Sequence, residues 1–303
     1  MIRRTLLFLS GQDQFKHILF RLPGSRGVAL RFVAGDTLED AVRAAARLND
    51  AGMRVTLDFL GESVSDHDEA RTAARAYEAS LEAIDDSVAE STISLKLTQL
   101  GLDIDEAFCE SNLRSIVERS ERLGNFVRID MESSVHTERA LRVFRRVFAD
   151  HRNVGIVIQS YLRRSEQDAR ELVALGAPVR LCKGAYQEPP SVAFQGREEV
   201  DASFVSLMRL LLDGGAPAAI ATHDDRMIQA TIEHLSRAGL GADAFEFQML
   251  YGVRRDYQLQ LVEDGYGMRV YVPYGSQWYS YLMRRMAERP QNLLFGMRAV
   301  LGR

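Results

Sequence analysis

The stretch of residues 269–288, RVYVPYGSQWYSYLMRRMAE, carries side chains suited to binding a small acid. A β-branched run ends in a turn at Gly275, and the helical spacing that follows brings Tyr281, Arg284 and Arg285 within two turns. Two adjacent guanidinium groups match a carboxylate, and aromatic rings nearby can wall an apolar ligand body. A solvated Arg-Arg pair is the plain alternative. The place of this helix in a repeated pattern favours a pocket for a small amino or hydroxy acid.

Bulk composition limits the classes of protein that the chain can belong to. With 303 residues and 46% hydrophobic content, the chain can bury a large core in one α/β domain or two smaller ones. The formal net charge of −4 argues against nucleic acid as a partner, because phosphate binding needs a concentrated positive field. Cys109 and Cys182 have no CxxC or Cys/His companion, so neither a disulfide framework nor a zinc site is expected.

The N-terminal stretch predicts a short helical segment rather than a membrane anchor. Its apolar run over residues 6–9 is too short to span a bilayer, and no small-residue cleavage site follows. Helical spacing of apolar residues over 15–22 predicts packing on the main domain. We therefore expect a helical preamble over residues 1–53 and a cytoplasmic protein, with peripheral membrane contact left open.

From residue 54 onward, short β-branched runs alternate with amphipathic stretches, which predicts right-handed βαβ crossovers and a parallel sheet. Strands are expected at 54–61, 91–98, 125–132, 153–160, 177–184, 217–222, 245–250 and 269–275. Helices are expected at 66–86, 105–123, 137–149, 164–175, 200–213, 224–238 and 253–264, with one more beginning near residue 276 and covering the site.

These units predict a single (βα)₈ barrel over residues 54–303, since such barrels typically take ~250 residues. An open doubly wound sheet is the alternative, but the segment after the first strand, FLGESVSD, lacks a glycine-rich dinucleotide motif. A helix over 35–51 with Asp36 or Thr37 as its cap feeds the first strand.

The barrel prediction places catalytic residues at the carboxyl ends of the strands. Nearly every expected strand ends in a polar or ionisable group, whereas a barrel interior is usually packed with Val, Ile and Leu. The residues at these ends are Glu62, Lys96, Asp130, Gln159, Arg180, Lys183, Thr222, His223, Gln248 and Tyr271. Because this polarity recurs at the same end of eight strands, it indicates a site.

Two of these ends suggest particular chemistry. Lys96 is either a Schiff-base nucleophile or a cation paired with Asp130 on the neighbouring strand, a pair that could also be purely structural. The sequence KGAY at 183–186 offers a lysine and small residues with accessible backbone amides, which suits a nucleotide phosphate. His223 stands beside two aspartates, but a metal site is not expected because three converging ligands are lacking. A redox cofactor would supply chemistry that these side chains cannot.

The ordered motifs SLKLTQLG, VRIDMES, VIQSYLRR, VRLCKGAY, ATHDD, EFQMLYGV, VYVPYG and YLMRRMAE resemble those of the proline dehydrogenase family. The resemblance covers about residues 57–288 and is closer to the monofunctional bacterial branch than to the bifunctional proline utilization proteins. It implies a (βα)₈ flavoenzyme that oxidises L-proline to Δ¹-pyrroline-5-carboxylate, the first step of proline catabolism. It further implies hydride transfer from C5 to N5 of a noncovalent FAD, with electrons passed to a membrane quinone.

The resemblance also assigns roles to residues by position. It implies Asp130 and Arg180 as catalytic groups, with Arg180 at the flavin N5. The implied substrate-binding residues are Lys96, Tyr186, Leu250, Tyr271, Tyr281, Arg284 and Arg285, the two arginines forming a carboxylate clamp. The implied cofactor contacts are Met131, Gln159, Arg180, Lys183, Gly184, Ala185, Thr222 and His223. Glu62 matches an acid that pairs with Arg284 as a gate.

Two positions depart from the bifunctional branch. Gln187 replaces a tryptophan and Tyr251 replaces a histidine, and neither position touches the hydride-transfer chemistry. Two rival functions remain on the same residues: a Schiff-base aldolase using Lys96 or Lys183, and a non-enzymatic amino-acid-binding barrel. A flavin absorption spectrum of the purified protein would separate all three.

Overall fold

A closed barrel of eight parallel strands forms the centre of the computed structural model, which describes residues 30–61, 64–278 and 281. The strands pair in chain order, and β1 closes the barrel against β8. They are β1 (Arg54–Phe59), β2 (Ser91–Leu95), β3 (Val127–Ile129), β4 (Val154–Gln159), β5 (Val179–Cys182), β6 (Ala218–Ala221), β7 (Phe245–Leu250) and β8 (Met268–Tyr274). The predicted (βα)₈ fold is confirmed.

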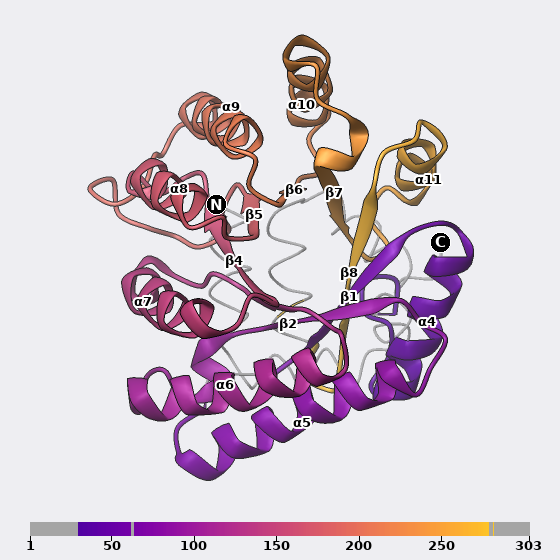
Figure 1. Cartoon of the computed structure of the whole chain (residues 1–303), viewed down its shortest axis with the longest axis vertical. Helices are drawn as coiled ribbons and strands as arrows, with labels where there is room; N and C mark the ends of the chain where they lie inside the picture. The colour runs from indigo at the N-terminus through magenta and orange to yellow at the C-terminus, as the bar shows by residue number, and fades with distance from the viewer. Residues whose placement is uncertain (1–29, 62–63, 279–280, 282–303) are drawn as a thin grey trace, which may run out of the picture.

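Helices surround the barrel on its outside (Figure 1). They are α4 (Leu38–Asp50), α5 (His67–Asp85), α6 (Glu106–Arg122), α7 (Ser134–Asp150), α8 (Ser165–Ala174), α9 (Arg197–Asp213), α10 (Asp225–Ala238) and α11 (Arg255–Glu263). Short 3₁₀ helices lie at Leu97–Leu100 and Ala242–Ala244. Thr37 caps α4 in a capping box with Asp40, which confirms one of the two expected caps.

Several strands are shorter than their β-branched patterns predicted. The strand predicted at 91–98 extends three residues beyond β2, because Lys96 is the N-cap of the 3₁₀ helix that follows. The range 125–132 overran β3 at both ends: the side chain of Asn125 bonds the carbonyl of Ser91, and the chain leaves the sheet after Ile129. Lys96 and Asp130 therefore belong to the loops at the barrel mouth, whereas residues such as Arg180 and Tyr271 lie within their strands.

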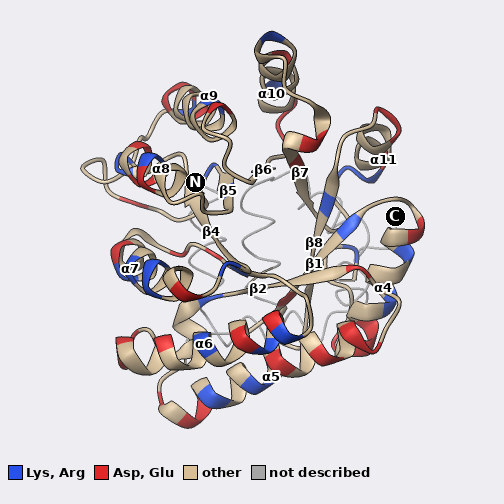
Figure 2. Cartoon of the chain, in the orientation of Figure 1, with Lys and Arg blue, Asp and Glu red and all other residues tan. Residues whose placement is uncertain are grey.

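The hydrophobic core lies between the strands and the helices. Alternate strand residues such as Val55, Leu57, Ile93 and Leu95 are fully buried in this layer. The intervening residues of the strands, which point into the barrel, include charged groups as well as small and polar ones. Figure 2 shows basic residues on the ribbons labelled β1 and β8 in addition to those on the outer helices.

The barrel interior thus differs from the expected packing of Val, Ile and Leu. Charged groups can be buried there because each of those described next has a partner. Arg128 donates from Nη1 to the Pro178 carbonyl at 2.7 Å. Burial, aided by the nearby Arg180, lowers the pKa of Arg128 to about 9. Arg269 pairs with Glu246 at 2.7 Å.

Some predicted features lie outside the described residues. They are the N-terminal apolar run, Glu62, Arg284, Arg285 and most of the helix expected after β8. Within the described part of the chain, no helix is long and apolar enough to cross a membrane. Cys109 and Cys182 form no disulfide bond.

Candidate active site

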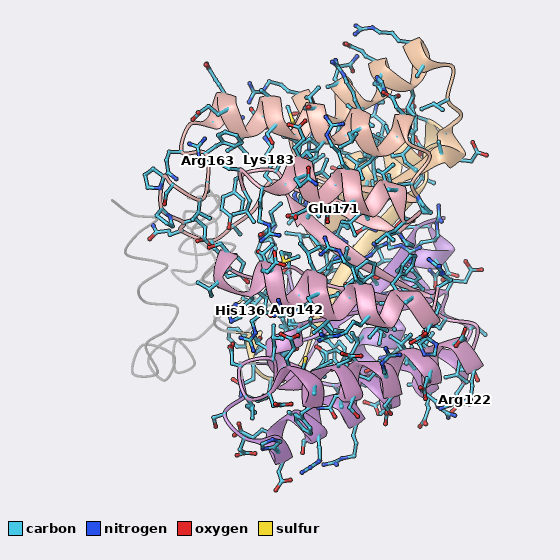
Figure 3. All side chains as sticks on the ribbon, turned by 60° about the vertical axis from the view of Figure 1, so that its left-hand side comes forward. Arg122, His136, Arg142, Arg163, Glu171 and Lys183 are labelled. Carbon is cyan, nitrogen blue, oxygen red and sulfur yellow. The ribbon has the colours of Figure 1, made fainter. Side chains whose placement is uncertain are left out.

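A cavity of about 490 Å³ opens at the carboxyl ends of the strands. Figure 3 shows Lys183, Arg163 and His136 at this end of the molecule and Arg122 at the opposite end. The predicted site residues that line the cavity are Lys96, Asp130, Met131, Gln159, Arg180, Lys183, Gly184, Ala185, Tyr186, Thr222, His223, Gln248, Leu250, Tyr271 and Tyr281. The structure therefore brings together every predicted site residue that it describes.

A buried charge cluster forms one wall of the cavity. Lys96 lies 2.8 Å from Asp58 and 3.7 Å from Asp130, so the predicted pair with Asp130 exists but is the longer of two. Burial alone would lower the pKa of Lys96, but the two carboxylates raise it above its ordinary value. Burial raises the pKa of Asp58, and Lys96 opposes that rise. Lys96 therefore stays a cation.

Asp130 is held mainly by other partners. Arg180 donates from Nη1 to one carboxylate oxygen at 2.7 Å, and the Tyr271 hydroxyl donates to the other at 2.7 Å. Ser94 lies at 3.3 Å from the first oxygen and also accepts a hydrogen bond from Arg180 Nη2. These bonds fix the guanidinium of Arg180 in the wall of the cavity, 5.4 Å from the ring centroid of Tyr271.

Asp58 is a site residue that the sequence reasoning missed. It is the only carboxylate within the run RVTLDF, and its side chain is 1% exposed. A lone carboxylate between Leu57 and Phe59, at an inward-pointing position, was the available signal. Glu132, which follows β3, is not among the residues that line the cavity. It accepts hydrogen bonds from the amide and hydroxyl of Thr98, and so joins the ends of β2 and β3.

Lys183, the lysine of the KGAY motif, has two carboxylate partners within the chain. Its ammonium group bonds Asp201 on α9 and Asp224, the N-cap of α10, the latter at 2.8 Å. Burial would raise the pKa of Asp224, but hydrogen bonds from Lys183 and the Arg226 amide, with Arg197 nearby, lower it below its ordinary range. The lysine is therefore positioned by carboxylates that a phosphate would have to compete with.

Three features of the cavity fit a flavin nucleotide. Gln159 Oε1 and Arg180 Nε are buried and have no hydrogen-bond partner within the described residues, so each is available to a ligand. Gly184 has φ +102°, and a Cβ there would come within 2.2 Å of the Tyr161 ring. A side chain is thus excluded where the backbone borders the cavity.

A second hollow of about 830 Å³ adjoins the first and shares Lys183, Gly184 and Tyr186 with it. It also contains Gln187 and Phe194. The two hollows together could hold a ligand that extends from the barrel mouth past Lys183 and Gly184.

His223 has a structural role in this wall. Its Nε2 accepts a hydrogen bond from the Leu250 amide at 2.9 Å, which fixes the ring beside the cavity. Among the residues that the structure describes, no group of three His, Cys, Asp or Glu side chains could hold a metal ion.

Comparison with known proteins agrees with this geometry. A family model described as proline dehydrogenase matches residues 41–296. Proline dehydrogenase 1 of Bacillus subtilis (strain 168) is 42% identical over 301 residues, which cover 99% of both chains. The proline dehydrogenase of Deinococcus radiodurans is 38% identical over 279 residues, or 90% of both chains.

A solved structure with the same barrel is that of proline utilization A (PutA) from Bdellovibrio bacteriovorus inactivated by N-propargylglycine. It matches with a TM-score of 0.82 and 26% identity over 87% of this chain and 33% of that chain. This chain thus spans about a third of that longer protein, but most or all of the length of the two proline dehydrogenases. The barrel, the site and the similarity to proline dehydrogenases over most of their length agree. The chain belongs to the proline dehydrogenase family and is an enzyme.

Proposed function

We propose that the chain oxidises L-proline to Δ¹-pyrroline-5-carboxylate in proline catabolism. The observation that carries the proposal is the paired charge cluster of Asp58, Lys96, Asp130 and Arg180 beside an aromatic-walled cavity. Proline needs such a combination, because it joins a carboxylate and an amine to an apolar ring. Relatives of nearly equal length carry the name proline dehydrogenase, which supports the same substrate here.

FAD, bound noncovalently, is the cofactor that we propose for the cavity. When bound, it would accept the hydride that leaves C5 of proline. Gln159 and Gly184 would contact it through an unpaired amide oxygen and a side-chain-free backbone, and Lys183 would face its phosphates. Met131, Ala185, Thr222 and His223 would complete its binding surface. Arg180, whose guanidinium is held in the cavity wall by Asp130, would stabilise the negative charge that the reduced flavin acquires.

The chain's own residues would orient proline. The rings of Tyr186, Tyr271 and Tyr281 and the side chain of Leu250 form an apolar wall against the substrate ring. Lys96 remains protonated, so it attracts the substrate carboxylate but cannot take up the proton that the amine must lose. Fixing the ring in a reactive orientation removes much of the entropic barrier to hydride loss.

Three predicted residues of this mechanism lie outside the described residues. Arg284 and Arg285 remain the proposed carboxylate clamp, and Glu62 with Arg284 the proposed gate. A membrane quinone remains the proposed electron acceptor, reached through peripheral membrane contact.

A Schiff-base aldolase is disfavoured by the state of the lysines. Such a nucleophile must be a neutral amine, and carboxylates raise the pKa of Lys96. Lys183 is bonded to two carboxylates as well.

The absorption spectrum of the purified protein, followed by anaerobic addition of L-proline, tests the proposal. We expect flavin bands that bleach with proline, and inactivation by N-propargylglycine. A colourless protein in which borohydride traps substrate on a lysine would contradict the proposal.

A further inference from the structure

The segment between β5 and α9 carries Tyr186 to the cavity and is bonded to a helix on the far side of β4. The carboxylate of Glu188 accepts a hydrogen bond from the Ser134 amide at 2.7 Å and another from the Ser134 hydroxyl. Ser134 is the first residue of α7. We call these two hydrogen bonds the Glu188–Ser134 tie.

Helix α7 receives its N-terminal cap from this tie. Its own N-cap residue, Ser133, makes no side-chain cap hydrogen bond, and its first turn contains no acidic residue. The first amides of a helix need acceptors, and negative charge is favourable at this end. Glu188, 54 residues farther along the chain, supplies both. The cap is therefore a tertiary contact between two loops of the barrel mouth.

The other end of the segment has separate anchors. Arg163 donates to the Pro190 carbonyl at 2.9 Å, and its guanidinium lies 4.6 Å from the centroid of the Phe194 ring. Leu162 and Ala193 form an isolated antiparallel bridge. These contacts fix residues 190–194, whereas the Glu188–Ser134 tie acts two residues from Tyr186. Figure 3 shows Arg163 and His136, which lies in the first turn of α7, at the same end of the molecule.

We infer that Glu188 is a positioning residue for the substrate pocket: by capping α7 it holds Tyr186 at the cavity wall. Tyr186 lines both hollows, so displacement of its backbone would change the shape of the pocket. Glu188 itself lines only the second hollow and acts on the substrate through Tyr186. The inference rests on the proposed function, because it assumes that Tyr186 borders the bound proline.

Glu188→Ala should remove the side-chain anchor next to Tyr186, while the hydrogen bond from Gln195 Nε2 to the carbonyl of residue 188 and the anchors at 190–194 persist. We expect KM for proline to rise about tenfold, since losing a helix cap shifts an equilibrium by roughly that factor. Turnover at saturation should change less than twofold, because Lys96, Asp130 and Arg180 stay bonded to one another. Glu188→Gln keeps one acceptor oxygen for the two Ser134 donors and should give an intermediate KM.

Asp105→Ala is the matched control, because Asp105 caps α6 through the Phe108 amide at 2.7 Å and has no hydrogen bond or ion pair with residues 183–196. Hydrogen exchange of the amides in residues 184–190 and in the first turn of α7 would be measured for all variants. KM, kcat and melting temperature would be measured in parallel. We expect faster exchange and a raised KM for Glu188→Ala alone, and a lowered melting temperature for both Ala variants.

An unchanged KM in Glu188→Ala, with a loss of melting temperature like that of Asp105→Ala, would overturn the inference. Unchanged exchange at 184–190 would overturn it as well. A parent protein that does not oxidise proline would refute the proposed function, whereas the exchange data would still report on the tie.

Discussion

Lys96→Met tests whether the buried carboxylate of Asp58 depends on Lys96 for its stability. The side chain of Lys96 is 18% exposed and that of Asp58 1%, so the variant would leave Asp58 as a buried carboxylate without its nearest cation. Removing one partner of a buried pair typically costs ~3–5 kcal/mol. Asp130 should be less affected, since Arg180 and Tyr271 still bond both of its oxygens.

The sign of the pH dependence follows from the carboxylate. In the variant the folded pKa of Asp58 rises further above its unfolded value, so the folded state binds more protons than the unfolded state. Stability then falls as pH rises between these two pKa values, by up to about 1.4 kcal/mol per pH unit. The destabilisation should therefore be smaller at pH 5 than at pH 8.

Urea denaturation of the parent, Lys96→Met and the double variant Asp58→Asn/Lys96→Met at several pH values would measure this. We expect the double variant to regain most of the lost free energy of unfolding, because a neutral amide removes the buried charge. A loss that is equal at all pH values, and that Asp58→Asn does not relieve, would refute the electrostatic reasoning in favour of lost packing.

Three further outcomes are expected. Gly184→Ala should lower the bound flavin content severalfold, since the added Cβ meets the Tyr161 ring at 2.2 Å; unchanged absorbance per protein would contradict this. The pKa of Asp224 is lower in the folded protein than in the unfolded chain, so ionised Asp224 stabilises the fold. This stabilisation is complete at pH values above the pKa in the unfolded chain, and it is lost as pH falls through the pKa in the folded protein. Asp224→Asn should accordingly lose less stability than the parent in acid titrations below about pH 4. Arg285→Met should raise the Kd of a proline analogue by about 30- to 1,000-fold, as expected for a lost bidentate carboxylate contact of ~2–4 kcal/mol. Equal analogue binding in variant and parent would remove Arg285 from the clamp.

The barrel was predictable because its elements have local signatures. β-branched runs alternate with amphipathic stretches, and each run became a strand of the observed order. The ends of the strands were less predictable. The apolar residues on both sides of Lys96 do not reveal that β2 ends at Leu95 and that a 3₁₀ helix begins at Leu97.

The site was predictable to the extent that its residues lie at or near the carboxyl ends of parallel strands, which meet at one end of the barrel. Lys96, Asp130, Arg180 and Tyr271 meet because parallel strands end at the same mouth. Asp58 was missed because the first strand was expected to run to residue 61, whereas β1 ends at Phe59 and Asp58 is its next-to-last residue.

Partners on helices were beyond sequence reasoning. Asp201 lies on the buried face of α9 with Phe204 and Met208, but the helical pattern does not reveal that its partner is Lys183. Glu188 likewise gives no local sign that it caps a helix 54 residues earlier. Such pairs depend on how loops and helices approach one another in three dimensions, which neither periodicity nor spacing encodes.

The charged barrel interior has a consequence for the response of the protein to temperature. Unfolding exposes apolar surface, which raises the heat capacity, but exposure of polar surface lowers it. Arg128, Glu246 and Arg269 occupy positions that aliphatic side chains fill in most barrels, so their exposure subtracts from the total. Calorimetry should therefore give a smaller heat-capacity increment per residue than for an aliphatic-filled barrel of equal length. The curve of unfolding free energy against temperature would be correspondingly broad and flat.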